Sequence, residues 1–468
     1  MEAKRYQLAI VGGGSAGFAA AIRAAESGAG VVMVNSGTIG GTCVNVGCVP
    51  SKTLIRAAEA RHRAGFHPFA GIGHHQPAVD WPAVRAAKDD LVTELRTAKY
   101  EEVLAAHPGI DFISARASLL PHGGLELEDG RSIRARSVII TTGSSPWVPD
   151  VPGLREAGFV DSTGLLEMEA LPDSLAVLGA GSVGLELAQA FARLGVEVTV
   201  LARSRLLSSH DPALGSELAR HLEAEGLRIR TGVQVASIES APHGRRIRFA
   251  SGAGDEEMLD VAKILLASGR RANTAGLGLK AAGVKLGPHG EILVDASCRT
   301  SSPRIFAAGD VTGGPMHVYV AAKAGQVAAD AALGLPELLD LSILPRVTFT
   351  DPAVAAVGLT EDEARATGHE PVSTTLPLDK VPRALAARDT RGFVKLIADG
   401  PTRRLLGAHI LAPEAGEMIM EPALAVRTGM TIEDLASMFH PYLTHAEGIK
   451  LAALAFDKDV AKLSCCAA

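Results

Sequence analysis

The sequence predicts an α/β fold built from two Rossmann-like units and a C-terminal α+β domain. A strand, a glycine-rich turn, a helix and a second strand follow one another at residues 6–35, and the same succession returns at residues 174–203. From about residue 344 the pattern changes to alternating short strands and late helices. A chain of 468 residues is also too long for one hydrophobic core, so several domains are expected.

The composition indicates a globular protein and argues against several classes of function. The formal net charge is -6 and aromatic residues make up only 4%, which argues against nucleic acid as a partner. No apolar stretch reaches membrane-spanning length, and the first strand pattern leaves no room for a signal peptide, so we expect a cytoplasmic protein without a membrane partner. Without an export signal, five cysteines favour catalytic or metal-binding roles over a disulfide framework.

The first unit carries a glycine pattern between its first strand and its helix: Gly12-x-Gly14-x-x-Gly17. The first glycine permits the tight turn, the second lets a pyrophosphate approach the backbone, and the third allows close packing of helix on strand. The second strand ends at Asn35, where an acid usually binds the adenosine ribose. Because the Asn35 amide oxygen can accept the same hydrogen bond, the unit is predicted to bind a dinucleotide.

The second unit repeats this arrangement with Gly179, Gly181 and Gly184. Its second strand lacks a terminal acid and is followed by Arg203 and Arg205. Guanidinium groups suit a 2′-phosphate, so this loop indicates NADPH rather than NADH. A solvated basic loop is the alternative interpretation.

The intervening segments suggest the domain boundaries. Asp80 is predicted to cap a long helix that continues to about residue 105, with Pro82 in its first turn. Three prolines within residues 146–152 are typical of a linker. We therefore divide the chain into residues 1–150, 151–275, 276–340 and 341–468.

The segment "GGTCVNVGCVPSK" places Cys43 and Cys48 in a turn-rich helical stretch, where they could approach closely enough to form a disulfide. Thr42 is predicted to be the N-cap, so that the helix dipole would lower the pKa of the Cys43 thiol and favour the reactive thiolate. Two incidental buried cysteines would be an equally good interpretation of the bare spacing.

The amino-acid sequence of this segment closely resembles the redox-active segment of the flavoprotein pyridine nucleotide-disulfide oxidoreductases. The resemblance covers nearly the whole chain and includes both glycine turns, "VIITTGSSP", "ILLASGRRAN" and "IFAAGD". It implies two Rossmann-like dinucleotide-binding domains, for FAD in residues 1–150 and for NADPH in residues 151–275. Residues 276–340 would complete the FAD site, and residues 341–468 would form the dimerisation domain of a homodimer.

The resemblance also implies roles for single residues. Cys48 would lie against the flavin as a thiolate, Cys43 would exchange with the substrate, and Lys52, paired with Glu186, would stabilise the anionic reduced flavin. Asp310 would contact the ribityl–phosphate part of FAD. Further cofactor contacts are expected from Thr42, Gly143 and Gly269.

Near the C-terminus, "HPYLTHAEG" differs from the thiol–disulfide reductases of the family. Those members carry His-Pro with a Glu five residues after the histidine, and the histidine serves the partner subunit as acid–base catalyst. Here His440 and Pro441 match, but His445 stands at the position of the acid, and Glu447 follows two residues later. His440 is therefore either a catalyst or a bystander.

The last residues, "LSCC", and the pattern "PYLT…EG.KLA" resemble the Hg(II)-reducing members of the family. There the terminal pair, here Cys465 and Cys466, captures Hg(II) from a thiol complex and passes it to the inner cysteine pair of the other subunit, near the residue matching Tyr442. The inner pair corresponds to Cys43 and Cys48. Soft Hg(II) prefers thiolate sulfur.

Two other functions stay open. The first is an NAD(P)H-dependent thiol–disulfide reductase such as dihydrolipoamide dehydrogenase, which His440-Pro441 favours. The second is a soft-metal-binding protein without turnover. Cys298 is interpreted as structural, and His74, His75 and His317 as loop or packing residues, because their spacing implies no metal site.

Overall fold

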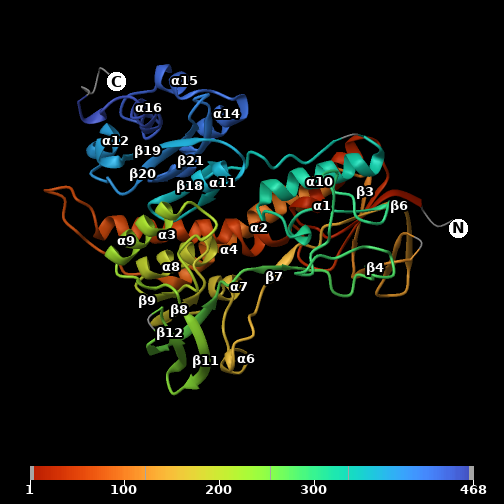
Figure 1. Cartoon of the computed structure of the whole chain (residues 1–468). Helices are drawn as coiled ribbons and strands as arrows, with labels where there is room; N and C mark the ends of the chain where they lie inside the picture. The colour runs from red at the N-terminus through yellow and green to blue at the C-terminus, as the bar shows by residue number, and fades with distance from the viewer. Residues whose placement is uncertain (1–4, 122, 253, 336, 463–468) are drawn as a thin grey trace.

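A mostly parallel sheet with two antiparallel edge strands, a parallel sheet and an antiparallel sheet form the framework of the computed structural model, which describes residues 5–121, 123–252, 254–335 and 337–462. Figure 1 shows the first sheet beside the N-terminus, the second sheet at lower left, and the C-terminal domain above the second sheet. Among the described residues, no helix combines the length and the apolar character that crossing a membrane requires.

The first sheet draws its strands from two distant parts of the chain. Four parallel strands lie in the order β3-β2-β1-β6, and β16 joins β6 from the central segment. This pairing is how residues near 305 complete the first unit. The strands are β1 (Arg5–Val11), β2 (Val31–Asn35), β3 (Ile110–Ser114), β4 (Ala117–Leu119), β5 (Leu125–Leu127), β6 (Ser132–Ile140) and β16 (Ile305–Ala307).

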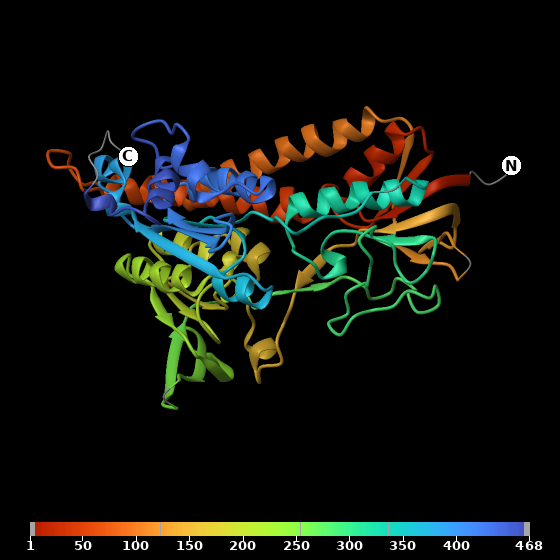
Figure 2. The ribbon, with the colours of Figure 1, turned by 45° about the horizontal axis from the view of Figure 1, so that its top comes forward.

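Two helices, α1 (Ser15–Glu26) and α10 (Val318–Leu333), lie side by side against this sheet (Figures 1 and 2). Their backbones approach closely, since a Cβ added at Gly325 would lie 2.2 Å from the carbonyl oxygen of Ala16. The small residues that suit this approach are alanines and glycines, which both helices contain in abundance. The close packing brings the "AGD" segment before α10 next to the first glycine turn.

Two long helices connect the first unit to the others. α3 (Cys48–Gly65) and α4 (Trp81–Arg96) extend across the molecule toward the second unit and the C-terminal domain (Figure 1). The predicted cap of α4 is confirmed, because the Asp80 carboxylate accepts a hydrogen bond from the Ala83 N–H at 3.1 Å. The helix continues through a π-helical turn, η1 (Thr97–Glu101), into α5 (Glu102–Ala105).

The second unit has a four-stranded parallel sheet in the order β10-β9-β8-β14 and a separate antiparallel sheet, β11-β12-β13. A two-stranded ribbon, β7 with β15, connects it to the first unit. The elements of the ribbon and the second unit are β7 (Ser144–Pro146), α6 (Leu154–Ala157), α7 (Ser162–Leu166), β8 (Ser174–Leu178), α8 (Ser182–Arg193), β9 (Glu197–Leu201), α9 (Pro212–Ala224), β10 (Arg228–Arg230), β11 (Gln234–Ala241), β12 (Gly244–Ala250), β13 (Glu256–Val261), β14 (Lys263–Leu266) and β15 (Arg270–Ala272). The central segment adds the short helix η2 (Asp310–Thr312) after β16.

The C-terminal domain is an antiparallel five-stranded sheet in the order β17-β18-β21-β20-β19, covered by helices. Its elements are β17 (Arg346–Thr348), β18 (Ala353–Gly358), α11 (Glu361–Ala366), β19 (Pro371–Pro377), η3 (Leu378–Lys380), α12 (Pro382–Ala387), β20 (Phe393–Asp399), β21 (Leu405–Ala412), α13 (Ala415–Met418), α14 (Met420–Thr428), α15 (Ile432–Ser437), α16 (Glu447–Leu454) and η4 (Val460–Lys462). The domain exposes large apolar side chains, which are typical of a surface buried by association. They are Met420, Leu424, Met438, Phe439, Tyr442 and Leu443.

A network of largely buried charges holds this domain against the second unit. Arg193 of α8 lies 2.6 Å from Glu225 and 2.9 Å from Asp351, and its side chain is only 4% exposed. Arg391 lies 2.9 Å from the other carboxylate oxygen of Asp351. Removing one charge would leave another buried without compensation, so the network fixes the relative placement of the two domains.

Candidate redox site and cofactor cavities

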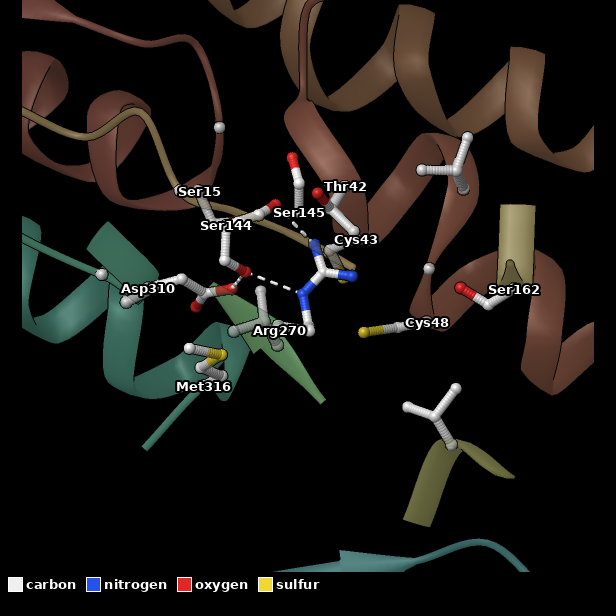
Figure 3. A pocket seen from close by; sticks show the side chains of 18 of the residues that line it. Ser15, Thr42, Cys43, Cys48, Ser144, Ser145, Ser162, Arg270, Asp310 and Met316 are labelled. Carbon is white, nitrogen blue, oxygen red and sulfur yellow. Dashed lines mark hydrogen bonds between the residues drawn. The ribbon is translucent and has the colours of Figure 1, made fainter. Parts of the chain in front are cut away.

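The predicted cysteine pair lies where two consecutive helices begin. α2 (Gly41–Val46) carries Cys43, and α3 begins at Cys48 directly after Gly47. The predicted N-cap at Thr42 is wrong: Gly40 precedes the helix with a φ of 91°, a left-handed conformation that favours glycine. Thr42 is instead inside the helix, and its side chain lines the same cavity as both cysteines (Figure 3).

The two thiols have opposite pKa shifts. The pKa of Cys48 is lowered to about 6, first because the Cys43 thiol donates a hydrogen bond to its sulfur and also because the Lys52 ammonium is near. That hydrogen bond, together with burial, raises the pKa of Cys43. The prediction that Cys43 would be the acidic thiol is therefore wrong, because the proton shared between the sulfurs stays on Cys43. Both cysteines are free thiols in this structure.

Lys52 and Glu186 form the predicted ion pair. The Lys52 Nζ lies 2.6 Å from Glu186 Oε2, and the Glu186 side chain is 5% exposed. The other oxygen of Glu186 accepts a hydrogen bond from the Phe349 N–H at 2.9 Å. The sequence alone would have suggested two ordinary surface groups, but the carboxylate is buried where three domains meet.

The first glycine turn opens into a cavity that suits FAD. A cavity of about 530 Å³ surrounds the glycines at 12–14 and Asn35, whose Oδ1 accepts a hydrogen bond from the Gly13 N–H at 2.9 Å. No described side chain caps the N-terminus of α1, so its N–H groups face the cavity. A Cβ added at Gly17 would lie 2.1 Å from the Gly12 carbonyl oxygen. The third position of the glycine motif therefore has no room for a side chain.

A second cavity of about 370 Å³ continues the first toward the cysteines. Both are lined by Gly14, Thr42 and Gly143, so together they reach from Asn35 to Cys48. An elongated space with a helix N-terminus at its middle and two thiols at one end suits a flavin dinucleotide. The ring system would then lie beside Cys48, and Asn35 would face the adenosine end.

Arg270 and Ser144 belong to this cavity although neither was assigned a role from the sequence. Ser144 Oγ donates to Asp310 at 2.7 Å, and Arg270 donates to Ser144 Oγ at 2.7 Å and to its carbonyl oxygen at 2.6 Å (Figure 3). The two residues lie in the quoted motifs "TTGSSP" and "SGRRAN", on the paired strands β7 and β15. The pairing of those strands, which the motifs alone do not reveal, brings them to Asp310.

Tyr100 is a third residue near this site that was assigned no role from the sequence. It lies on the π-helical turn η1, with its ring centroid 4.9 Å from that of Phe18. Burial raises the pKa of its phenol, and the charges of Cys43 and Cys48 add to the shift. Its ring lies against Gly40, the residue before α2, since a Cβ added at Gly40 would lie 3.0 Å from Tyr100 Cδ2. A π-helical turn, often found at functional sites, has no signature in hydrophobic periodicity.

The second glycine turn keeps the same geometry. A Cβ at Gly184 would lie 2.5 Å from the Gly179 carbonyl oxygen, whereas no described atom comes within 4 Å of one at Gly181. The open space at Gly181 leaves room for a pyrophosphate at the N-terminus of α8. Gly269, whose φ is 113°, lies in the strand-to-strand connection before Arg270 and accepts a hydrogen bond from the Trp147 N–H.

The two candidate arginines for a 2′-phosphate differ. Arg203 is exposed in the loop that follows β9. Arg205 donates to the carbonyl oxygens of Leu207, Ser208 and His210, so most of its guanidinium is bound within its own loop. Arg203 is therefore the better candidate for binding a 2′-phosphate.

At the other end of the chain, His440 has a carboxylate partner that the sequence spacing did not suggest. Its Nε2 lies 2.7 Å from Glu421, 19 residues upstream on α14. The carboxylate of Glu447 accepts instead from the Leu443 N–H at 3.2 Å. The Tyr442 side chain is half-exposed on the C-terminal domain. Cys465 and Cys466 lie outside the described residues.

Cys298 agrees with its structural interpretation. Cys298 is buried, and its thiol donates to the Ala324 carbonyl oxygen at 3.5 Å. Within the described ranges, no group of three or more histidine, cysteine or acidic residues is arranged to hold a metal ion.

Comparison with known proteins agrees with this geometry. Residues 6–325 match the family model "Pyridine nucleotide-disulphide oxidoreductase", and residues 344–453 match the dimerisation domain of the same family. The chain belongs to this family. Pyridine nucleotide-disulphide oxidoreductases of this kind contain FAD and depend on NAD(P)H, and the dimerisation domain indicates a homodimer.

Three mercuric reductases within the family are close in sequence. That of Streptomyces lividans is 47% identical over 468 residues, covering 99% of this chain and 98% of its own length. Those of Staphylococcus aureus and Shigella flexneri are each 46% identical, over 99% and 98% of this chain and 84% and 82% of their own.

Two solved structures of the family share the fold. The HOCl-induced flavoprotein disulfide reductase RclA from Escherichia coli is 30% identical, with a TM-score of 0.85, over 97% of this chain and 100% of its own. LpdA from Mycobacterium tuberculosis is 29% identical, with a TM-score of 0.84, over the same shares.

Proposed function

We propose that this chain is an NADPH-dependent flavoprotein that reduces Hg(II) to Hg(0). The observation that carries the proposal is the thiol pair Cys43 and Cys48 at the end of a dinucleotide cavity, in a chain 46–47% identical to mercuric reductases over nearly its full length. The overall reaction balances as NADPH and Hg(II) giving NADP⁺, a proton and Hg(0). Bound FAD supplies the relay that accepts a hydride and delivers two electrons.

The residues of the chain bind the ion and tune the charge around it. The Cys48 sulfur, with its pKa lowered to about 6, is a thiolate at neutral pH and offers the soft ligand that Hg(II) prefers. When Cys43 gives up its proton, it supplies the second sulfur. Lys52 lies one helical turn from Cys48, and its positive charge favours the Cys48 thiolate. The same charge would stabilise the anionic reduced flavin if the flavin ring binds beside Cys48.

We propose that the ion reaches this pair from the partner subunit's Cys465 and Cys466. The similarity of the chain end to Hg(II)-reducing members of the family supports this route. So does the apolar surface of the dimerisation domain, which carries Tyr442. Stepwise exchange between two thiol pairs would move Hg(II) from its thiol complex without release. We place the reaction in the cytoplasm, where thiols stay reduced.

One assay tests the proposal. The purified holoenzyme is given NADPH and excess thiol with Hg(II), with lipoamide disulfide or with glutathione disulfide, while NADPH oxidation and mercury vapour are both followed. NADPH consumption matched by vapour release with Hg(II) is the expected result. Binding of Hg(II) without NADPH consumption would show a soft-metal-binding protein and overturn the proposal.

A thiol–disulfide reductase is the second candidate, because the similar RclA is a flavoprotein disulfide reductase. Faster turnover with either disulfide than with Hg(II) would favour it. The structure offers little acid–base capacity for that reaction at His440, since both of its ring nitrogens have partners within the chain.

A further inference from the structure

His440 is held from both sides of its ring. Its Nε2 lies 2.7 Å from the Glu421 carboxylate on α14, and its Nδ1 lies 3.3 Å from the Met438 carbonyl oxygen. The side chain is only 4% exposed. We call these three groups, the His440 ring, the Glu421 carboxylate and the Met438 carbonyl, the His440 clasp.

The partners in the clasp determine its protonation. A carboxylate and a carbonyl oxygen both accept hydrogen bonds, so each ring nitrogen must carry a proton. The ring is then a cation, and its pKa is raised, first by the hydrogen bond to Glu421 and then by that charge and the Met438 carbonyl. Burial and the charge of Lys450 on α16 oppose this shift without reversing it. A neutral ring would lose one of the two bonds.

The clasp anchors one end of the segment 438–443, which we call the Tyr442 loop. The other end is anchored by Glu447, whose carboxylate accepts from the Leu443 N–H. Leu443 has a φ of 61°, which is strained for a branched side chain and persists only when its surroundings hold it. Between the anchors, Phe439 is fully exposed and Tyr442 half-exposed.

We propose that His440 is a positioning residue: with Glu421, the protonated ring holds the Tyr442 loop in the conformation that meets the partner subunit. It is not the acid–base catalyst of the reaction. The fully exposed Phe439 ring and its apolar neighbours on the dimerisation domain make a second copy of this chain the surface that the loop meets. The benefit to turnover rests on the proposed function, since it needs Tyr442 to act beside the partner's cysteine pair.

The clasp makes this conformation sensitive to pH. Because the folded-state pKa of His440 lies above its ordinary value, the clasp is complete below about pH 6.5, the unperturbed histidine pKa. It is lost as the pH rises through the raised value. An acid–base catalyst would instead need a ring nitrogen free to face the substrate.

The first test measures the clasp without mercury. The holoenzyme dimer is labelled with carbon-13 at the histidine Cε1 positions and titrated by NMR, and His440→Phe assigns the signal. The expected pKa of His440 lies above about 6.5, and Glu421→Gln lowers it by at least about one unit. Glu433→Gln, which removes an acid paired with Arg403 in the same domain, leaves it unchanged. A His440 pKa at or below the ordinary value in the dimer would overturn the proposal.

The second test compares kcat/KM for thiol-bound Hg(II) between variants and wild type across the pH range. In Glu421→Gln and His440→Gln the ratio to wild type is expected to fall on the order of tenfold at low pH and to approach one above the His440 pKa. Hydride transfer from NADPH to FAD stays at the wild-type rate. His369→Phe, which removes the ion pair of His369 with Asp399 in the same domain, changes neither.

The outcomes separate the proposals. A ratio that is constant with pH in Glu421→Gln, or a pH profile of His440→Phe identical to wild type, would overturn the positioning role. Absence of mercury turnover in the wild type would overturn the proposed function, and the NMR titration would then still decide whether the clasp exists.

Discussion

The Lys52 ammonium lies 2.6 Å from the Glu186 carboxylate, and this contact joins α3 to α8 in the lining of the cavity that holds Cys43 and Cys48. Because Lys52 follows Cys48 by four residues on one helix, its charge lies on the same face one turn away. Glu186 in turn accepts the Phe349 N–H. The reactivity of Cys48 is thus connected to both the second unit and the dimerisation domain.

Replacing Cys43 should change the acidity of Cys48. Cys43→Ala removes the hydrogen bond that contributes most to the lowered pKa of about 6, so the pKa of Cys48 should rise by about one unit or more. Cys43→Ser keeps a donor and should have a smaller effect. The rate of alkylation of Cys48 against pH, with Cys465 and Cys466 replaced by Ala, measures this. Equal values in both variants would contradict the shared-proton geometry.

Replacing Lys52 should be more disruptive than replacing Glu186. Lys52→Met leaves a 5% exposed carboxylate without its cation and should cost roughly 2–3 kcal/mol, less than a fully buried pair because Lys52 is a third exposed. It should also raise the pKa of Cys48. Glu186→Gln keeps the acceptor for the Phe349 N–H and should cost less. Thermal unfolding of the two holoenzyme variants compares their losses of stability. A larger loss in Glu186→Gln than in Lys52→Met would contradict the prediction.

The third glycines of the two turns should affect different cofactors. Gly17→Ala places a Cβ 2.1 Å from the Gly12 carbonyl oxygen and should abolish FAD retention, measured as the flavin-to-protein absorbance ratio. Gly184→Ala, at 2.5 Å from Gly179, should retain FAD but raise the KM for NADPH at least tenfold. Gly109→Ala is the matched control, because no described atom lies within 4 Å of its Cβ and it lines neither cavity. A flavin-free Gly184→Ala protein would count against the assignment.

The arginines after β9 should separate cofactor preference from loop stability. Arg203→Ala should raise the KM for NADPH about tenfold and leave that for NADH nearly unchanged. Arg205→Ala frees three carbonyl oxygens and should lower the melting temperature more than Arg203→Ala. Steady-state kinetics with both cofactors and a melting curve check this. If neither variant changes the preference, the loop is only a solvated basic surface.

The terminal cysteines should matter for the substrate and not for the cofactor. Cys465→Ala with Cys466→Ala should slow turnover of thiol-bound Hg(II) while NADPH still transfers its hydride to FAD at the wild-type rate. Stopped-flow absorbance and mercury release measure the two steps separately. Unchanged turnover with every mercury–thiol complex would refute the delivery route.

The local patterns predicted the secondary structure that holds the site. The glycine turns and the Asp80 cap are in place, because each depends on residues close in sequence. The thiol that carries the lowered pKa was not predictable in this way. It depends on which sulfur keeps the proton, and that is set by how Cys43 on α2 and Cys48 on α3 are placed relative to each other.

By itself, the sequence determined that the chain has two dinucleotide units, a paired-cysteine segment and a third domain, since periodicity and motif spacing are local properties. Only the tertiary structure decided that Ser144 joins Arg270 to Asp310, that Tyr100 lies against Gly40 before the helix of Cys43, and that Glu421 holds His440. These partners are 19 to 166 residues apart along the chain, or come together through a π-helical turn or a two-stranded ribbon. Such contacts form only when burial of distant apolar faces brings the elements together, and no local pattern records that.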